Sequence, residues 1–369
     1  MPFRYIGNEP LLLLMVCIYI FDILQNLFFN PIFAIARFFT FVSVLLFVLY
    51  ILGIYYELIL RHNTPFINIH KPYIFYSYYN IATILLCAAL CILGLVDPSS
   101  NPITDNSLIH DNVSSGSQYY FPLFLSVTEG ASRLFGQIGL PGFTGLSHEP
   151  HVINYIILPS FFISRLLIKK RLLLYLSYVF YFLFLLCSWS TTAFLAFIVV
   201  IVIHTIWSII IKREMGFIIP LFVVAGIVIL YGGELLDLIR LEFVRKTVEQ
   251  TGSVDYTSNM WQYLLHPTSL IGTGNIPMMA PSSNATSSYD IGLISFALDI
   301  LFFLLIIFKM LQCVLNRNIG VHCLGCSFLY FFLHCIKVNM LVFNYPLFAF
   351  MIVLLSVTTR VVKTNKQVI

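Results

Sequence analysis

Residues 192 to 203 read TAFLAFIVVIVI, an uninterrupted apolar run that decides the fold class. A transmembrane β-strand would alternate apolar and polar residues over about 10 positions, whereas this run is apolar on every face. Runs long enough to cross a bilayer, about 20 residues each, recur along the whole chain. Of the 369 residues, 59% are hydrophobic and only 10% are charged, and the mean hydropathy is +0.92. An ordinary soluble domain carries roughly 25% charged residues, so a soluble globule is excluded.

The sequence therefore predicts an all-α polytopic membrane protein with about 10 transmembrane helices, which form one membrane domain over residues 1–369. The first apolar run continues without a small-residue cleavage motif, so we expect it to be an uncleaved span. The predicted spans cover residues 11–29, 38–60, 73–96, 152–168, 172–188, 191–211, 216–232, 291–308, 320–336 and 339–358.

The basic residues predict the orientation of these spans. We place the C-terminal tail, with Arg360, Lys363 and Lys366, in the cytoplasm, and the other connections then alternate between the two sides. This leaves 14 of the 20 Lys and Arg residues on the cytoplasmic side. The six on the outside are Arg37, Arg133, Arg240, Arg245, Lys246 and Lys337. Because Lys and Arg favour cytoplasmic loops, both termini are predicted to be cytoplasmic.

Two predicted outer loops, residues 97–151 and 233–290, are too long to be simple connectors. The first begins with a polar stretch and continues into a glycine-rich segment, and glycine allows a backbone to approach a ligand closely. The second opens with an amphipathic helix over residues 234–249, which we expect to lie along the membrane surface. Loops of this length are usually functional or disordered, so we expect the chemistry of the protein in these two segments.

Arginines in the two outer loops are candidates for phosphate recognition, because the guanidinium group is always charged and offers forked donors. Arg245 could instead pair with an acidic residue one helical turn away, and Arg240 could pair with Asp237. Arg133 follows Glu129 by four residues, but it stands in a glycine-rich segment that does not favour a long helix. It is therefore the arginine that we most expect to bind substrate.

Carboxylates and imidazoles stand where the outer loops enter the next span. His148, Glu149 and His151 flank Pro150, and such groups can act as general acid or base. The alternative is a helix start with proline in the first turn and an acidic residue beside it. The histidine spacing differs from the HExxH motif of zinc proteases, so a metal site is not favoured. Asp290 could meet a substrate at the outer interface or serve as a helix N-cap.

The spans themselves contain few polar residues, and the eight cysteines lie in or beside apolar runs. Cys323 and Cys326 form a CxxC pattern, which inside an apolar helix we interpret as two small packing residues rather than a redox or zinc site. His204 and Asp22 lie within spans, where polar groups often mark a site or a pathway. For Asp22 we favour a structural pairing with Arg37.

The run Ser132-Arg133-Leu-Phe-Gly136 is followed by Phe143-Thr-Gly145-Leu-Ser-His-Glu149-Pro150. Together they resemble the arginine, glycine and Glu-Pro pattern of Wzy-type O-antigen and capsule polymerases. The resemblance extends over roughly residues 130–300. The further matching positions are Ser188-Trp-Ser190-Thr-Thr, Arg240, Arg245, Trp261, Leu270-Ile-Gly272-Thr-Gly274 and Tyr289-Asp290-Ile-Gly292.

The resemblance implies a GT-C-like glycosyltransferase in the bacterial inner membrane that joins undecaprenyl-diphosphate-linked oligosaccharides at the periplasmic face. It implies no cofactor and no metal, because arginines take the place of the cation that usually accompanies a diphosphate. Membrane lipid and a polysaccharide chain-length regulator are the further partners implied, and no nucleic acid is expected. The implied catalytic residues are Arg133, Glu149, Arg240, Arg245 and Asp290. The implied substrate-binding residues are Gly145, His148, His151, Trp261, Gly272 and Gly274.

Two alternatives stay open. The related O-antigen ligases, which transfer glycan to the lipid A core, resemble sequences with a histidine near the helix that follows the large loop. This chain has Tyr289 and Asp290 there, which favours a polymerase. A transporter of lipid-linked oligosaccharides would place its charged residues along a central cavity and often contains internal repeats. Here no convincing repeat is found, and the polar residues concentrate in the outer loops.

Overall fold

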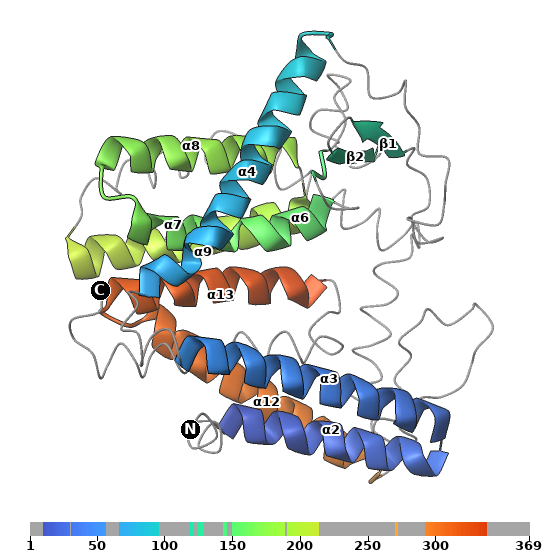
Figure 1. The fold of residues 1–369 in the computed structure, drawn as a ribbon. Helices are drawn as coiled ribbons and strands as arrows, with labels where there is room; N and C mark the ends of the chain where they lie inside the picture. The colour runs from blue at the N-terminus through green and yellow to red at the C-terminus, as the bar shows by residue number, and fades with distance from the viewer. Residues whose placement is uncertain are drawn as a thin grey trace, which may run out of the picture. The chain divides into compact units, whose positions relative to one another are not determined.

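The fold is given by a computed structural model and consists mostly of helices (Figure 1). The structure describes residues 10–29, 31–56, 66–95, 118–121, 124–128, 143–145, 150–188, 190–213, 270–271 and 292–337. The helices are α2 (Pro10–Phe29), α3 (Pro31–Tyr56), α4 (Phe66–Ile92), α6 (Pro150–Ile157), α7 (Pro159–Leu167), α8 (Arg171–Cys187), α9 (Thr191–Lys212), α12 (Gly292–Val314) and α13 (Ile319–Lys337). Two short strands, β1 (Gln118–Phe121) and β2 (Phe124–Thr128), form an antiparallel hairpin in the first predicted outer loop.

Three helices are long and apolar enough to span a membrane, over His70–Ile92, Ala193–Lys212 and Gly292–Val314. Shorter apolar helices cover Leu13–Phe28, Val152–Leu167, Leu172–Cys187 and Ile319–His334. Large apolar side chains point outward from several helices, as a lipid-facing surface requires. The helical membrane-protein class thus agrees with the structure. The number of ten spans and the sides of the loops stay predictions, and the predicted spans 216–232 and 339–358 lie outside the described residues.

Several helices begin or end away from their predicted limits. The second span was predicted from residue 38, but α3 already begins at Pro31, directly after Asn30. Proline suits the first helical position because its missing N–H has no partner there in any helix. Arg37 therefore lies within α3 and not in the connection between two spans. Similarly, α12 continues to Val314, six residues beyond the predicted end of its span.

The predicted span 152–168 is two helices, because Pro159 interrupts it between α6 and α7. Proline lacks an N–H and clashes with the carbonyl one turn earlier, so it breaks a helix or kinks it. Hydroxyl groups then bind carbonyls around the break. Tyr73 on α4 donates to the Ile156 carbonyl, Ser160 to the Ile157 carbonyl and Ser327 on α13 to the Pro159 carbonyl, each at 2.6 Å.

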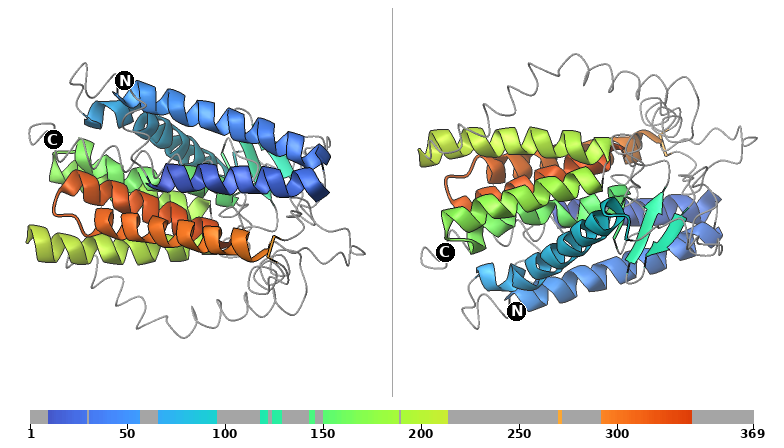
Figure 2. Two further views of the ribbon diagram at one scale, coloured as in Figure 1. Left: turned by 90° about the horizontal axis from the view of Figure 1, so that it is seen from below. Right: turned by 90° about the horizontal axis from the view of Figure 1, so that it is seen from above.

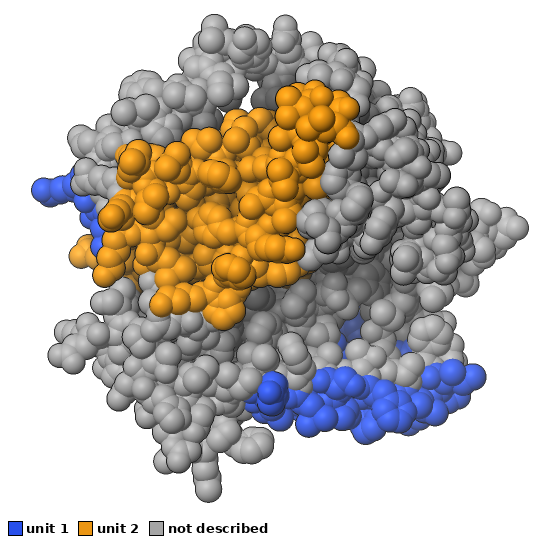
Figure 3. Space-filling view, turned by 45° about the horizontal axis from the view of Figure 1, so that its top comes forward, with its two compact units in different colours: residues 1–64, 208–315, 335–368 blue, residues 65–207, 316–334, 369 orange. Residues whose placement is uncertain are grey.

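The chain forms two compact units (Figure 3). Unit 1 comprises residues 1–64, 208–315 and 335–368, and unit 2 comprises residues 65–207, 316–334 and 369. In unit 1, α2 packs against both α3 and α12. The short described segment Leu270–Ile271 is held between two of these helices. Gln25 on α2 donates its side-chain amide to the Ile271 carbonyl, and the Ile294 N–H on α12 donates to the Leu270 carbonyl at 3.2 Å.

Unit 2 is built around aromatic side chains. In Figure 2, the axes of α8, α9 and α13 are nearly parallel. Helix α4 packs against α7 and α8. The ring of Phe161 lies 5.0 Å from Phe197, 5.4 Å from Tyr181 and 4.7 Å from Tyr178. Such pairs contribute about 0.5 to 1.5 kcal/mol each beyond the burial of their area. The Tyr181 hydroxyl in turn contacts Ser160 at 2.6 Å, which joins the aromatic core to the break at Pro159.

Ser327→Ala tests whether the hydroxyl groups stabilise this break. Loss of the bond to the Pro159 carbonyl should lower the free energy of unfolding by about 0.5 to 1.5 kcal/mol, measured by denaturation in mixed detergent micelles. Ser77→Ala is the matched control, because the equally buried Ser77 donates to the Tyr73 carbonyl of its own helix. Equal losses in the two variants would contradict the proposed contribution of Ser327.

Candidate functional site

Most of the residues predicted to carry chemistry lie outside the described part of the chain. Those are Arg133, Glu149, Arg240, Arg245, Asp290, His148, Trp261, Gly272 and Gly274. Whether they converge on one site therefore stays a prediction. His151 is placed by its backbone in the first turn of α6. Gly145 is the one predicted site residue whose full surroundings are described.

Gly145 belongs to a short buried segment, Phe143-Thr144-Gly145, that packs against the helices of unit 2. The Phe143 N–H donates to the carbonyl of Cys187 at the end of α8, at 3.1 Å. Gly145 has a φ of +60°, and a Cβ atom added to it would lie 2.9 Å from Cδ1 of Ile84 on α4. Glycine is therefore required both by the backbone conformation and by the close approach to α4. The sequence predicted a close approach to a ligand at this position, and the described neighbour is a helix.

A group of four buried polar residues, which we call the Asn154 cluster, lies at the same end of α8. It consists of Asn154, Ser188, Tyr330 and His334. The Asn154 side-chain amide donates to the Ser188 carbonyl at 2.6 Å, and the Ser188 hydroxyl donates back to the Asn154 amide oxygen at 3.1 Å. The Tyr330 hydroxyl contacts the Asn154 carbonyl at 3.3 Å and Nδ1 of His334 at 3.0 Å. Ser188 opens a stretch that supported the family resemblance, and in the structure it joins α8 to α6.

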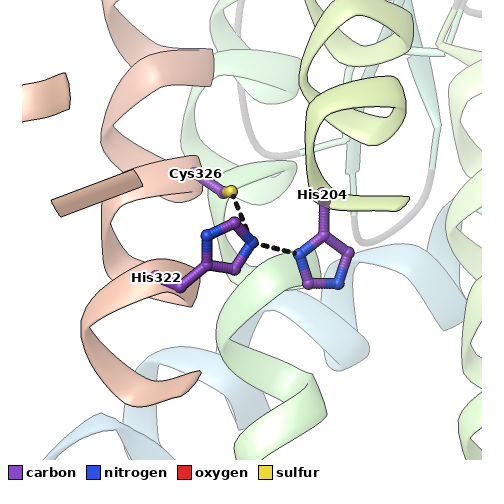
Figure 4. Close-up of side chains that lie close together, drawn as sticks. All are labelled: His204, His322 and Cys326. Carbon is purple, nitrogen blue, oxygen red and sulfur yellow. Dashed lines mark hydrogen bonds between the residues drawn. The ribbon is translucent and has the colours of Figure 1, made fainter. Parts of the chain in front are cut away.

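A second group, which we call the His204 cluster, contains Arg165, His204, His322 and Cys326. Figure 4 shows His204 projecting from α9 toward His322 and Cys326, which share one face of α13. Nε2 of His322 lies 2.9 Å from Nδ1 of His204 and 3.3 Å from Sγ of Cys326. The Arg165 guanidinium contacts Nε2 of His204 at 2.7 Å. All four side chains are buried, Arg165 with an exposed fraction of 8%.

The Arg165 guanidinium can only donate hydrogen bonds, and this determines which nitrogens of the cluster carry protons. Arginine cannot accept a hydrogen bond, so Nε2 of His204 is the acceptor and a neutral His204 carries its proton on Nδ1. This proton then points at Nε2 of His322, which must offer its lone pair. The Cys326 thiol is directed at the same nitrogen. Two protons, one from His204 and one from Cys326, therefore converge on a single lone pair of His322.

His322 is held in place by a stacking contact with its ring and by a cap at the start of its helix. The indole of Trp207 stacks on it with ring centroids 3.8 Å apart and 6° between the planes, and Nε1 of Trp207 donates to the Asn316 carbonyl at 3.0 Å. Asn318 caps the start of α13, because its amide oxygen accepts from the N–H of Gly320 at 2.8 Å. The orientation of His322 is thus set by stacking and by the cap.

Sequence reasoning found part of this cluster and missed the rest. The interpretation of His204 as a buried polar residue within a span is confirmed. Cys326 had been interpreted as a packing residue together with Cys323, but its thiol contacts His322. The signal for this contact was the spacing of His322 and Cys326, which puts residues four apart on one face of a helix. The placement of Arg165 on the cytoplasmic side stays a prediction, and its contact with His204 in the interior was not predicted.

Comparison with protein-family models, with curated proteins and with solved structures finds no match for this chain. The assignment of a function therefore depends on the residue pattern and on the geometry described above.

Gly145→Ala tests the packing of the segment Phe143-Thr144-Gly145 on α4. The positive φ alone should lower the free energy of unfolding by about 1 to 2 kcal/mol, and the contact with Ile84 should add to that loss. Gly94→Ala is the matched control, because Gly94 has a φ of +66° and open space around it. Ile84→Val removes the Cδ1 atom and should restore part of the stability of Gly145→Ala. Equal losses for the two glycine variants would contradict the close approach.

Proposed function

We propose that the chain is a membrane glycosyltransferase that polymerises oligosaccharide repeat units linked to undecaprenyl diphosphate. In this proposal it has a GT-C-like arrangement of ten spans in the bacterial inner membrane, and it builds O-antigen or capsular polysaccharide at the periplasmic face. The observation that carries the proposal is the pattern from Arg133 through Gly145 to Glu149-Pro150 in a long loop between apolar spans. A polysaccharide chain-length regulator is the proposed protein partner.

The proposed reaction transfers the growing glycan from its lipid diphosphate to a hydroxyl group of the incoming lipid-linked unit. The bond between the anomeric carbon and the diphosphate oxygen breaks, and a new bond forms between that carbon and the acceptor oxygen. Negative charge then develops on the departing diphosphate. Fixed positive groups aimed at this charge lower the barrier, and we assign that role to Arg133, Arg240 and Arg245. The charge of these arginines makes a metal ion unnecessary for this step.

The acceptor hydroxyl must lose a proton as the new bond forms, so the reaction needs a general base. Glu149 is our first candidate, followed by Asp290 and then by His148 or His151. Glu149 comes first because it directly precedes Pro150, the first residue of α6, so its Cα stays about 3.8 Å from the start of an anchored helix.

Binding of the glycan and the lipid carrier would involve Gly145, Trp261, Gly272 and Gly274. An aromatic ring suits the apolar face of a sugar, and glycine admits a close approach of the backbone. The hydrogen bonds of Gln25 and Ile294 to the segment Leu270–Ile271 support this assignment. They anchor the chain directly before the Gly272-Thr-Gly274 element to α2 and α12.

A transporter of lipid-linked oligosaccharides is the alternative that one structural observation favours. Transporters often contain broken helices whose free backbone groups bind the substrate, and α6 and α7 form such a broken span. Here, however, Tyr73, Ser160 and Ser327 bind carbonyls at the break. These carbonyls already accept hydrogen bonds from side chains of the protein. The polymerase is therefore the better supported of the two proposals. An O-antigen ligase is the other enzymatic alternative.

Arg133→Ala tests the polymerase directly. In a strain that lacks the chromosomal copy, wild type should restore a ladder of long glycans on a gel, and the variant should restore only single repeat units, because the leaving diphosphate is no longer stabilised. Arg317→Ala is the control for the loss of one positive charge, since Arg317 is exposed in the connection between α12 and α13. Membrane insertion of each variant is checked by immunoblotting.

The other outcomes of this experiment separate the alternatives. If deletion of the protein removes every glycan-capped species, the defect lies in ligation or in transport. If the ladder is normal for Arg133→Ala, Arg133 has no part in polymerisation. A normal ladder in the deletion strain would contradict the family resemblance as a whole.

A further inference from the structure

We propose that His204, His322 and Cys326 form a binding site for one divalent transition-metal ion of the zinc class. The site is separate from the glycosyl-transfer chemistry proposed above and does not depend on it. The three ligand atoms would be Nδ1 of His204, Nε2 of His322 and Sγ of Cys326, which all lie within 4.8 Å of one another. Two imidazoles and one thiolate are a ligand set that zinc accepts.

The distances between the ligand atoms are close to those that such an ion requires. Zinc binds imidazole nitrogen at about 2.0 to 2.1 Å and thiolate sulfur at about 2.3 Å, so tetrahedral ligands lie about 3.3 Å (N to N) and about 3.6 Å (N to S) apart. The separations in the structure are 2.9 Å between the two nitrogens and 3.3 Å between nitrogen and sulfur. The third pair, Nδ1 of His204 and Sγ of Cys326, lies within 4.8 Å, so small side-chain movements would bring all three atoms to the separations that the ion requires. The fourth position would be open to water or to another ligand.

The charge of the cluster also fits a divalent ion. Without metal, two protons converge on the lone pair of His322, one from Nδ1 of His204 and one from the Cys326 thiol. A divalent ion that replaces both protons leaves the net charge of the cluster unchanged. This matters because an uncompensated charge in an apolar interior is energetically costly. Metal binding and the release of two protons are therefore linked.

Arg165 limits the affinity of the proposed site. Its guanidinium donates to Nε2 of His204, so this nitrogen carries no proton. If the metal binds at Nδ1, both ring nitrogens are then without a proton, and His204 is an imidazolate. The positive charge of Arg165 stabilises this anionic ring, but it also repels the bound cation. A glutamine at this position could accept a proton from Nε2, which would let His204 bind as an ordinary neutral imidazole. The affinity should then increase.

The surroundings of the cluster hold its ligands in place. The ring of Trp207 stacks on His322, and the ring of Phe162 lies edge-on to His204 at 5.7 Å. Neighbours that fix the orientation of a ligand alter metal affinity by about 10- to 100-fold when they are changed. His204 is on α9 and the other two ligands are on α13, 118 residues further along the chain. A bound ion would thus link two distant helices of unit 2 and stabilise their packing.

The experiment is a cobalt titration of the full-length protein, purified in detergent and stripped of metal with a chelator. Co²⁺ bound to a thiolate absorbs in the near ultraviolet, and we expect this band to saturate at one equivalent and to disappear when Zn²⁺ is added. Cys326→Ser should abolish the band. Cys323→Ser is the matched control, because Cys323 is a buried cysteine of the same helix outside the proposed ligand set, and it should keep the band.

Two results would overturn the site. One is the absence of a thiolate band in the wild-type protein. This result does not depend on how well any variant folds. The other is a band of equal size in Cys326→Ser, which would place the ion on another cysteine. Size-exclusion chromatography of Cys326→Ser and Cys326→Ala shows whether a lost band reflects a lost fold, and a lost band in either variant that elutes as wild type supports the site.

Arg165→Gln tests whether Arg165 limits the affinity. Removal of the repulsive charge should tighten Co²⁺ binding, measured by competition with a chelator of known affinity. Unchanged or weaker binding in a variant that elutes as wild type would contradict the limit that Arg165 sets on the affinity. The glycan ladder is not a readout of these experiments, so failure of the metal site and failure of the proposed polymerase are distinguishable.

Discussion

The hydrogen bonds around Pro159 are the constraint on which the packing of unit 2 depends. Backbone groups in an apolar environment need partners, and a proline within a span removes one N–H and displaces the carbonyls that precede it. Tyr73, Ser160 and Ser327 come from three different helices and bind carbonyls at the break. Because each hydroxyl must be in reach of its carbonyl, these bonds fix how α4 and α13 lie against α6 and α7.

Two clusters of buried polar side chains in unit 2 lie toward different ends of its helices, and aromatic residues lie between them. The Asn154 cluster lies where α8 ends, beside the anchored segment that contains Gly145. The His204 cluster lies near the start of α13, whose cap at Asn318 follows the exposed Arg317. Between them, Phe161 and its aromatic neighbours contribute packing. Polar groups near helix ends can form hydrogen bonds with the adjoining loops. The middle of a span favours aromatic rings, which need few hydrogen-bond partners.

This division suits a protein that works at one face of a membrane. A rigid bundle can hold the ends of long loops at fixed points, and the loops then carry the reacting groups. Gly145 and Pro150 are two such points for the first predicted outer loop, and Leu270–Ile271 is held in the same way for the second predicted one. A buried metal ion in the His204 cluster would add rigidity at the start of α13. In the proposed function the helices would be a scaffold, and the arginines of the loops would supply the chemistry.

The sequence by itself determined that the chain is a helical membrane protein, because 59% hydrophobic residues in long runs leave no other stable arrangement. It also predicted most helix positions, since apolar runs such as residues 191–211 coincide with α9. It did not predict that Pro159 divides the span 152–168 into two helices, nor that α3 begins as early as Pro31.

For the candidate site, it marked His204 and Gly145 but not their neighbours. The contact of His204 with His322 was decided only by the tertiary structure. The reason is physical: the apolar runs are similar on all faces, so nothing in them tells which sides of two distant helices meet.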